Sequence, residues 1–168
     1  MKLTREQELL RQNVREFVKK EMADYPEHVD ETGCIPKDIM EKLARYQFIS
    51  PIIPKEYGGA GAGYVSYAII MEEISKRCAS TGTFITAGAS LVAVPLLNVG
   101  TEIQKQKYLK PLASGEKIGC FGLTEPGAGS DAASGTTTAR WEGDHYVLNG
   151  RKCLLTTAPI ADFAIISD

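Results

Sequence analysis

The chain has 168 residues, of which 43% are hydrophobic and 24% are charged, and its formal net charge is -2. This composition is typical of a soluble globular protein with one or two small domains, and a chain of this size can bury roughly 70% of its unfolded surface. The 19 basic and 21 acidic residues are spread along the chain, so no basic stripe could follow a phosphate backbone, which excludes nucleic acid as an expected partner.

Helical patterns fill the first two thirds of the sequence. Thr4 and Gln7 form a capping box, and apolar residues then recur at three- and four-residue steps, which predicts a first helix. A second helix is expected to begin at Pro36. It must end by the FISPIIP segment, because two prolines there prevent a continued helix.

A long uncharged stretch follows the next predicted helix. EYGGAGAGY is expected to be a flexible loop, and the pattern is helical again from about Val65. No charged residue lies between Arg77 and Glu102, a length that would span a bilayer. Because many small and polar residues are mixed with the apolar ones, the favoured interpretation is a helix buried on most sides and interrupted near Pro95, without membrane insertion.

The periodicity changes after one more helix. A capping box at Thr101 and Gln104 predicts the start of that helix, and Ser114-Gly115 predicts its end. Short segments rich in β-branched and aromatic residues then alternate with turn signals, among them Glu142-Gly143-Asp144 and the hairpin pair Asn149-Gly150. The expected antiparallel strands are IGCFGL, TTTARW, HYVLNG, RKCLLTT and DFAIIS.

The predicted fold class is therefore α+β with segregated domains. An all-α N-terminal domain is expected over residues 1–116, followed by the beginning of an antiparallel β domain over residues 117–168. A sheet of so few strands would be open, with exposed edges. We expect the sequence to be an N-terminal piece of a longer protein or to need a partner that covers the sheet.

The cysteines and histidines do not form a metal-binding pattern. No CxxC pair is present, and only His28 and His145 could join the cysteines as ligands. We expect no metal and no disulfide, and the N-terminus lacks the apolar core of a signal peptide, which favours a cytoplasmic protein with buried thiols. The cysteines are Cys34, Cys78, Cys120 and Cys153.

The glycine-rich stretch GCFGLTEPGAGSDAASG is the strongest candidate for a site. Residues 127–132 match the GxGxxA dinucleotide pattern, but a strand pattern follows where a helix would be needed. GxSxG is absent around Ser130, which argues against a hydrolase nucleophile. A plain loop between strands stays possible. Alternatively, bare backbone amides beside the hydroxyls of Thr124 and Ser130 would bind an anion such as a phosphate.

Longer motifs resemble the flavin-dependent acyl-CoA dehydrogenases. FGLTEPGAGSDAASGTTTA, followed by GDHYVLNGRKCLLT and ADFAIIS, is similar to the start of their β domain. The helical block is similar through PKEYGGAGAGYVSYAIIMEEISK, CASTG and VGTEIQKQKYLKPLASGEK. The resemblance covers essentially the whole chain and is greatest to short-chain, butyryl-type members. In glutaryl-type members a carboxylate-binding arginine would fall near Gly82 of this sequence.

The resemblance implies a helical domain, a β domain and a C-terminal four-helix domain, with FAD between the last two. It also implies the mechanism of the family, in which a glutamate base removes the α proton of an acyl-CoA thioester while the β hydride moves to flavin N5. The glutamate positions of the family lie beyond this chain, so no catalytic residue is assigned and the 168-residue chain alone is expected to be inactive. An electron-transferring flavoprotein as acceptor and a homotetramer are also implied.

The site residues of the family fall on two segments of this sequence. Gly129 and Ser130 are expected where the cofactor meets the CoA thioester, with Ser130 binding substrate, and Glu125 is expected to stabilise the loop. Leu154 stands where the family usually places Trp or Phe, which removes aromatic contact area. The Thr156 hydroxyl is expected to donate toward flavin N5. The full set of implied cofactor-binding residues is Phe121, Gly122, Leu123, Thr124, Gly129, Ser130, Leu154, Leu155 and Thr156.

Two other classes of protein stay open. One is a thioester-binding module that kept the fold without redox chemistry, which Leu154 and the absent base favour. The other is a structural subunit completed by a partner chain, which the open sheet edge favours.

Overall fold

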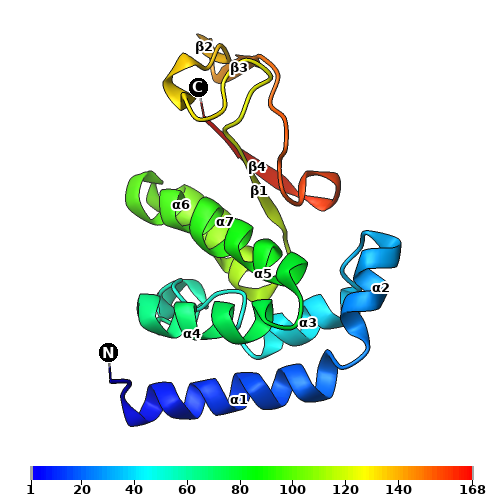
Figure 1. The fold of residues 1–168 in the computed structure, drawn as a ribbon. Coiled ribbons are helices and arrows are strands. Elements are labelled where there is room, and N and C mark those ends of the chain that lie inside the picture. Colours follow the sequence, from blue (N-terminus) through cyan, green and yellow to red (C-terminus); the bar gives the residue numbers. More distant parts are fainter. Residues whose placement is uncertain (1, 168) are drawn as a thin grey trace.

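The computed structural model describes residues 2–167, which form a helical block and a smaller strand-containing part (Figure 1). The predicted order of helices first and strands last is confirmed. The helices are α1 (Arg5–Glu21), α2 (Tyr25–Thr32), α3 (Lys37–Arg45), α4 (Gly63–Ser75), α5 (Ala79–Thr86), α6 (Val94–Val99) and α7 (Glu102–Ser114). The strands are β1 (Gly119–Gly122), β2 (Thr138–Glu142), β3 (His145–Asn149) and β4 (Phe163–Ile166). The domain boundary after residue 116 stays a prediction and falls between α7 and β1.

Both predicted capping boxes are present. The Thr4 hydroxyl accepts a hydrogen bond from the Gln7 amide at 3.2 Å, and the Thr101 hydroxyl accepts one from the Gln104 amide at 3.3 Å. Each glutamine side chain in turn accepts from the threonine amide. At the other end of α7, Gly115 has a φ of 74°, which favours glycine. Local sequence therefore sets both ends of α7 and the start of α1.

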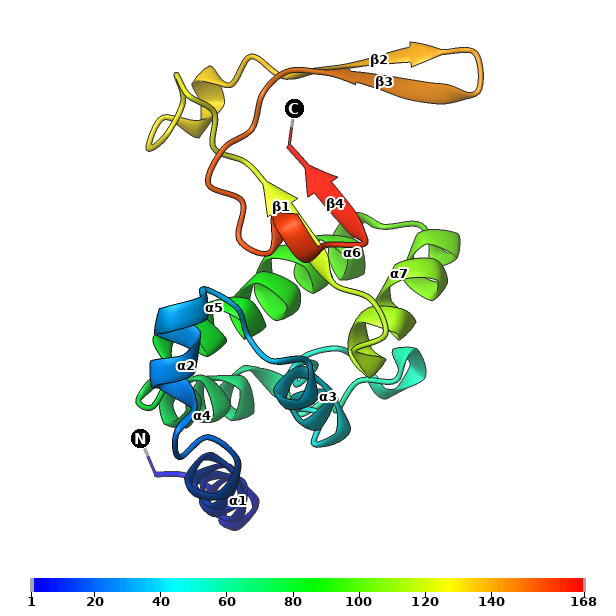
Figure 2. The ribbon, with the colours of Figure 1, turned by 90° about the vertical axis from the view of Figure 1, so that its right-hand side faces the viewer.

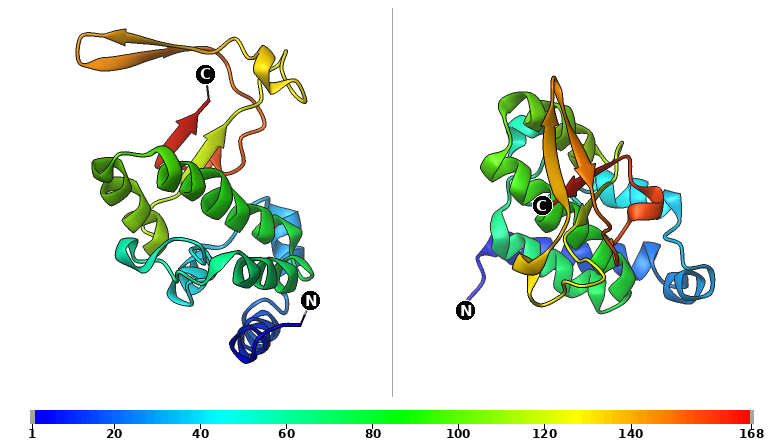
Figure 3. Two further views of the ribbon diagram at one scale, coloured as in Figure 1. Left: turned by 90° about the vertical axis from the view of Figure 1, so that its left-hand side faces the viewer. Right: turned by 90° about the horizontal axis from the view of Figure 1, so that it is seen from above.

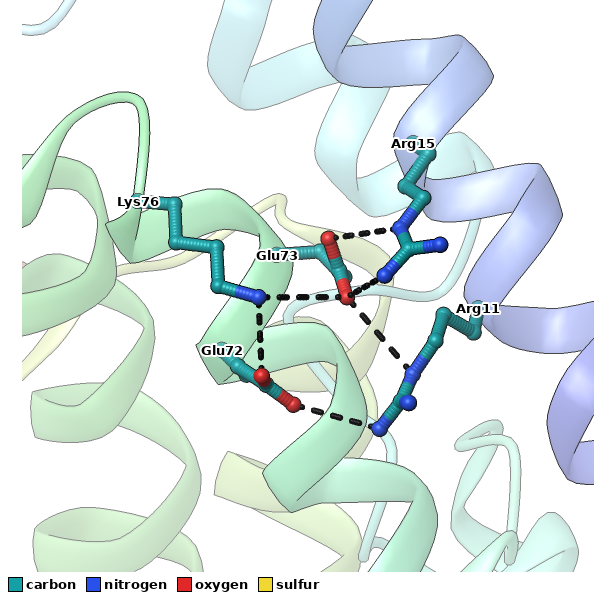
Figure 4. A network of polar contacts seen from close by, with 5 residues as sticks. All are labelled: Arg11, Arg15, Glu72, Glu73 and Lys76. Carbon is teal, nitrogen blue, oxygen red and sulfur yellow. Dashed lines mark hydrogen bonds and ion pairs between the residues drawn. The ribbon is translucent and has the colours of Figure 1, made fainter. Parts of the chain in front are cut away.

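An ion-pair network joins α1 to α4 (Figure 4). Arg15 donates to both carboxylate oxygens of Glu73, each at 3.0 Å, and the Glu73 side chain is only 6% exposed. Arg11 and Lys76 contact the same carboxylate and also pair with Glu72. The hydrogen bond from Arg15 lowers the pKa of Glu73, so this nearly buried group stays ionised.

Two apolar clusters form the core. The first joins the first five helices, and its members include Val14, Phe17, Met22, Tyr25, Leu43, Phe48, Ile70, Ile74 and Ile85. The second lies between α6, α7 and the strands, and it includes Ile53, Val92, Leu96, Leu109 and Leu112. Phe163 of β4 packs on Tyr108 of α7 with ring centroids 4.8 Å apart. This contact fixes the start of the sheet to the helical block.

Two features of the helical block differ from expectation. The sequence pattern does not predict α2, because only Tyr25 and Val29 of this short helix are buried and Pro26 stands in its first turn. The expected flexible loop EYGGAGAGY is also shorter, since a 3₁₀ turn covers Lys55–Tyr57 and α4 already begins at Gly63.

The helix predicted to break near Pro95 is continuous from Ala79 to Val99. A π-helical segment, Ala87–Ala93, links α5 to α6, and Pro95 stands in the first turn of α6, where a missing N–H is tolerated. By length and composition this helix could cross a membrane. It packs against α4 and β1, yet only 39% of its most apolar window is buried. One exposed face carries Leu91, which is 42% exposed.

The strands form two small sheets. β2 and β3 pair antiparallel around the predicted turn at Gly143, and their hairpin extends away from the helical block (Figures 2 and 3). β1 and β4 instead pair in parallel, with Gly119 opposite Phe163. Antiparallel pairing is therefore wrong for this pair. The long connection that contains the hairpin lets the chain return in the same direction.

The segment RKCLLTT forms no strand, and Asn149-Gly150 is not a hairpin turn. Gly150 allows a close approach, because a Cβ there would lie 2.7 Å from the Thr137 Cα. Side chains bind the segment to β1 and the residues that follow it. The Thr157 hydroxyl donates to the Gly119 carbonyl at 3.0 Å, and Lys152 donates to the Leu123 carbonyl at 3.0 Å. The segment is thus held to β1 and the following residues mainly by side-chain hydrogen bonds, without a strand ladder.

Candidate functional site

A cavity of about 180 Å³ lies where the exposed face of the 79–99 helix meets the end of β1 and the segment after β3. Five of the nine residues that the family resemblance implies for the cofactor line it. Both predicted segments contribute, so residues distant in the sequence are neighbours here, while their roles stay predictions. The lining residues are Ala87, Leu91, Phe121, Leu123, Thr124, Cys153, Leu154 and Thr156.

The other four predicted residues do not line this cavity. Gly122 and Leu155 lie against each other, because a Cβ added to Gly122 would be 3.1 Å from the Leu155 Cδ2. Gly129 and Ser130 are exposed in the loop after β1. Apart from its two chain neighbours, no residue has an atom within 4 Å of a Cβ built on Gly129. The structure therefore leaves Ser130 outside the cavity.

Leu154 has an unusual backbone and an unusual exposure. Its φ is 58°, in the left-handed region that disfavours side chains with a Cβ, and its side chain is 89% exposed. Such conformations cost about 1–3 kcal/mol and are concentrated at functional sites. The backbone thus presents an apolar side chain at the cavity instead of packing it into a core.

The cavity combines apolar walls with two available hydroxyl groups. Phe121, Leu123 and Leu154 supply the apolar surface. The hydroxyls of Thr124 and Thr156 make no hydrogen bond to any other group within residues 2–167. This donor set suits a flat heterocycle whose ring is apolar and whose edge carries polar atoms.

Glu125 is buried beside the cavity, and both of its carboxylate oxygens accept hydrogen bonds. Its carboxylate accepts from the amide and hydroxyl of Thr136, from the amide and hydroxyl of Thr137, and from Lys152. The Lys152 contact, followed by the hydrogen bonds from the two threonines, holds its pKa far below the usual carboxylate range. The predicted loop-stabilising role fits this geometry, since a base needs a lone pair that faces the substrate.

The sequence-based prediction did not single out Lys152. Its side chain is 9% exposed, and its ammonium donates to the Glu125 carboxylate at 2.8 Å. When a carboxylate such as that of Glu125 is buried, it needs a cation as partner. This need could have indicated a basic partner for Glu125 from the sequence, but it does not distinguish Lys152 from the other lysines and arginines.

Other cavities and clusters offer weaker candidates. A larger cavity of about 660 Å³ lies between α3, α5, the end of α7 and the start of β1. Its lining mixes three basic and three acidic side chains and includes none of the predicted site residues. Within residues 2–167, no three His, Cys, Asp or Glu residues come together in a way that could hold a metal ion. The smaller cavity is therefore the better candidate.

Comparison with known proteins identifies domains along most of the chain. Residues 4–116 match the acyl-CoA dehydrogenase N-terminal domain, and residues 120–167 match the acyl-CoA dehydrogenase middle domain. The chain is 49% identical over 166 residues to a 3-(aryl)acrylate reductase of Clostridium sporogenes, covering 99% of this chain and 44% of that protein. It is 49% identical over 164 residues to a short-chain specific acyl-CoA dehydrogenase of Clostridium acetobutylicum, covering 98% and 43%.

Solved structures show the same likeness. A chain from a structure of the electron transferring flavoprotein of Acidaminococcus fermentans has a TM-score of 0.93 and 39% identity, covering 100% of this chain and 45% of that one. An acyl-CoA dehydrogenase complexed with FAD from Bacillus anthracis has a TM-score of 0.88 and 32% identity, covering 98% and 28%. The chain thus spans less than half the length of these proteins.

Proposed function

Because the chain belongs to the acyl-CoA dehydrogenase family, we propose that the full-length protein is an FAD-dependent enzyme that dehydrogenates a fatty acyl-CoA thioester. The substrate would lose a proton from its α carbon and a hydride from its β carbon. Bound FAD supplies the two-electron acceptor for that hydride. The present chain would supply the N-terminal helical domain and the start of the flavin site.

The observation that carries this proposal is the meeting of both predicted flavin segments at one cavity. Phe121, Leu123 and Leu154 would contact the flavin ring and exclude water from it. The hydroxyls of Thr124 and Thr156 would bind its polar edge, with Thr156 near N5. Ser130 remains the proposed thioester-binding residue and would act from the exposed loop after β1.

The catalytic base would come from outside this chain. Glu125 cannot take the role in this conformation, because its carboxylate already accepts five hydrogen bonds and has a strongly lowered pKa. We therefore propose that the isolated 168-residue chain has no turnover. Any steady-state oxidation of an acyl-CoA by that chain would contradict this part of the proposal.

The relatives support the proposed partners but leave the direction of the reaction to be measured. The likeness to a chain from an electron transferring flavoprotein structure supports such a flavoprotein as electron acceptor. The short-chain relative supports a short acyl chain, and we further propose a cytoplasmic homotetramer. Because another relative is an acrylate reductase, the enzyme should be assayed in both directions.

The decisive experiment uses the full-length protein. We expect the purified protein to show a visible flavin absorption band that is bleached when butyryl-CoA is added without oxygen. Thr156→Val should slow this bleaching, while Thr83→Val, on the exposed side of α5, should leave it unchanged. A full-length protein that binds no FAD would show the proposal to be wrong.

A further inference from the structure

Lys152 is a nearly buried cation with two defined partners. Its ammonium donates to the Glu125 carboxylate at 2.8 Å and to the Leu123 carbonyl at 3.0 Å. The Lys152 and Glu125 side chains are 9% and 4% exposed. Burying two charges this far is unfavourable unless the geometry satisfies both. The pair therefore holds a specific arrangement of the backbone around it.

The path of the Lys152 side chain depends on Gly122. A Cβ at position 122 would lie 3.3 Å from the Lys152 Cγ, so the bare glycine lets the lysine stem pass close to β1. Gly122 does not line the cavity. In this structure, Gly122 makes room for the side chains of Ile166, Leu155 and Lys152.

Three hydrogen bonds join residues 123–125 to residues 152–153, next to the cavity. Besides the two from Lys152, the Cys153 amide donates to the Thr124 carbonyl at 2.8 Å. No strand ladder joins the segments, because residues 151–155 form no strand. Leu123 and Thr124 on one side, and Cys153 on the other, all line the cavity. The lysine bonds thus bear directly on the spacing of the cavity walls.

We propose that Lys152 is a positioning residue that holds the two flavin-facing segments in register, acting through the Leu123 carbonyl and Glu125 without touching the cofactor. The expected effect of Lys152 on FAD binding rests on the proposed function. The hydrogen bonds by which Lys152 joins the two segments do not depend on it. Removing the ammonium would leave the Glu125 carboxylate buried without a cation. The segments would then separate or shift, and the cavity walls would lose their fixed spacing.

The test is an FAD titration of the full-length protein with matched lysine variants. Lys152→Met should raise the Kd for FAD roughly ten- to hundred-fold and change the flavin absorption band, since displacing the groups that orient a site has effects of this size. Lys152→Arg, which keeps the charge and the donors, should restore most of the affinity. Lys19→Met, on the exposed face of α1, should match the wild type.

The readouts separate positioning from simple loss of stability. Each titration is referred to the folded fraction from far-UV circular dichroism, and an unchanged Kd and spectrum in folded Lys152→Met would overturn the proposal. Should that variant fail to fold, Glu125→Gln takes its place and is expected to raise the Kd in the same direction. An unchanged Kd in Glu125→Gln would equally overturn it.

A separate measurement distinguishes this inference from the proposed function. If the wild-type protein binds no FAD, the proposed function fails, and amide hydrogen exchange at Cys153 decides the positioning role. Protection of the Cys153 amide should fall in Lys152→Met and stay unchanged in Lys19→Met. Equal protection in the two variants would overturn the role of Lys152.

Discussion

Substitutions at Leu154 should affect the stability of the chain and its binding of FAD in different ways, so the two effects can be measured separately. Its φ of 58° costs a residue with a Cβ about 1–2 kcal/mol. Glycine avoids that cost but loses about 0.5–1 kcal/mol through the greater freedom of the unfolded chain. Because the side chain is 89% exposed, truncating it removes little packing. Leu154→Gly should therefore raise the free energy of unfolding by about 0.5–1 kcal/mol.

Leu154→Ala is the matched control. Alanine removes the same apolar contact but keeps the Cβ, so it should give no gain in stability. Both variants should weaken FAD binding. Full burial of a leucine side chain contributes about 1.5–3 kcal/mol, and a side chain that covers one edge of a ring should contribute about half of that, or roughly three- to tenfold in Kd.

Urea unfolding of the flavin-free chain and FAD titration of the full-length protein measure the two effects. If Leu154→Gly is no more stable than Leu154→Ala, the left-handed backbone does not cost what its geometry implies. If both variants bind FAD like the wild type, Leu154 does not contact the cofactor. In that event the cavity would not be the flavin site.

Three further predictions concern stability. Glu73→Gln should lower the free energy of unfolding by about 1–3 kcal/mol in urea denaturation, since an amide cannot accept both guanidinium donors and leaves cations unpaired. Burial raises the pKa of Tyr25 to about 12, so the contribution of Tyr25 to stability should be intact below pH 10 and fall by about 2 kcal/mol by pH 12. In Tyr25→Phe, which also loses the hydrogen bond to Thr81, the alkaline loss of stability in urea denaturation should be smaller by this amount. Gly150→Ala should cost about 1–3 kcal/mol by displacing Thr137, and unaltered stability would contradict the close contact seen here.

The sequence predicts a helix well when residues close to its ends in the sequence determine where it begins or stops. The Thr4 and Thr101 capping boxes need only residues three positions away, so sequence alone places α1 and α7. Helix α2 was not predicted, because its stability depends on the burial of Tyr25 and Val29 against other parts of the chain. The strands show the same limit. The β2–β3 hairpin closes over one turn, whereas the parallel pairing of β1 with β4 joins residues as distant as Gly119 and Phe163.

The candidate site was predictable only in part. The family resemblance identified both segments, and Phe121, Leu123, Thr124, Leu154 and Thr156 do meet at one cavity. Sequence alone could not tell which residues of each segment face that cavity. The bend of the chain after β1 decides the orientation, and it depends on contacts with residues that follow β3.

The contacts between those segments suggest why a glycine-rich loop stands beside a buried ion pair. Bare backbone gives access, but a loop without a strand partner would move, and a cofactor site needs fixed walls. The Glu125 carboxylate binds the backbone of Thr136 and Thr137 on one side and Lys152 on the other, so three separate stretches of chain converge on one group. Since its pKa lies far below the usual carboxylate range, the Glu125 carboxylate stays ionised at neutral and mildly acidic pH. Acid should open this junction only below the usual carboxylate range, which makes the spacing of the cavity walls insensitive to pH between 5 and 8.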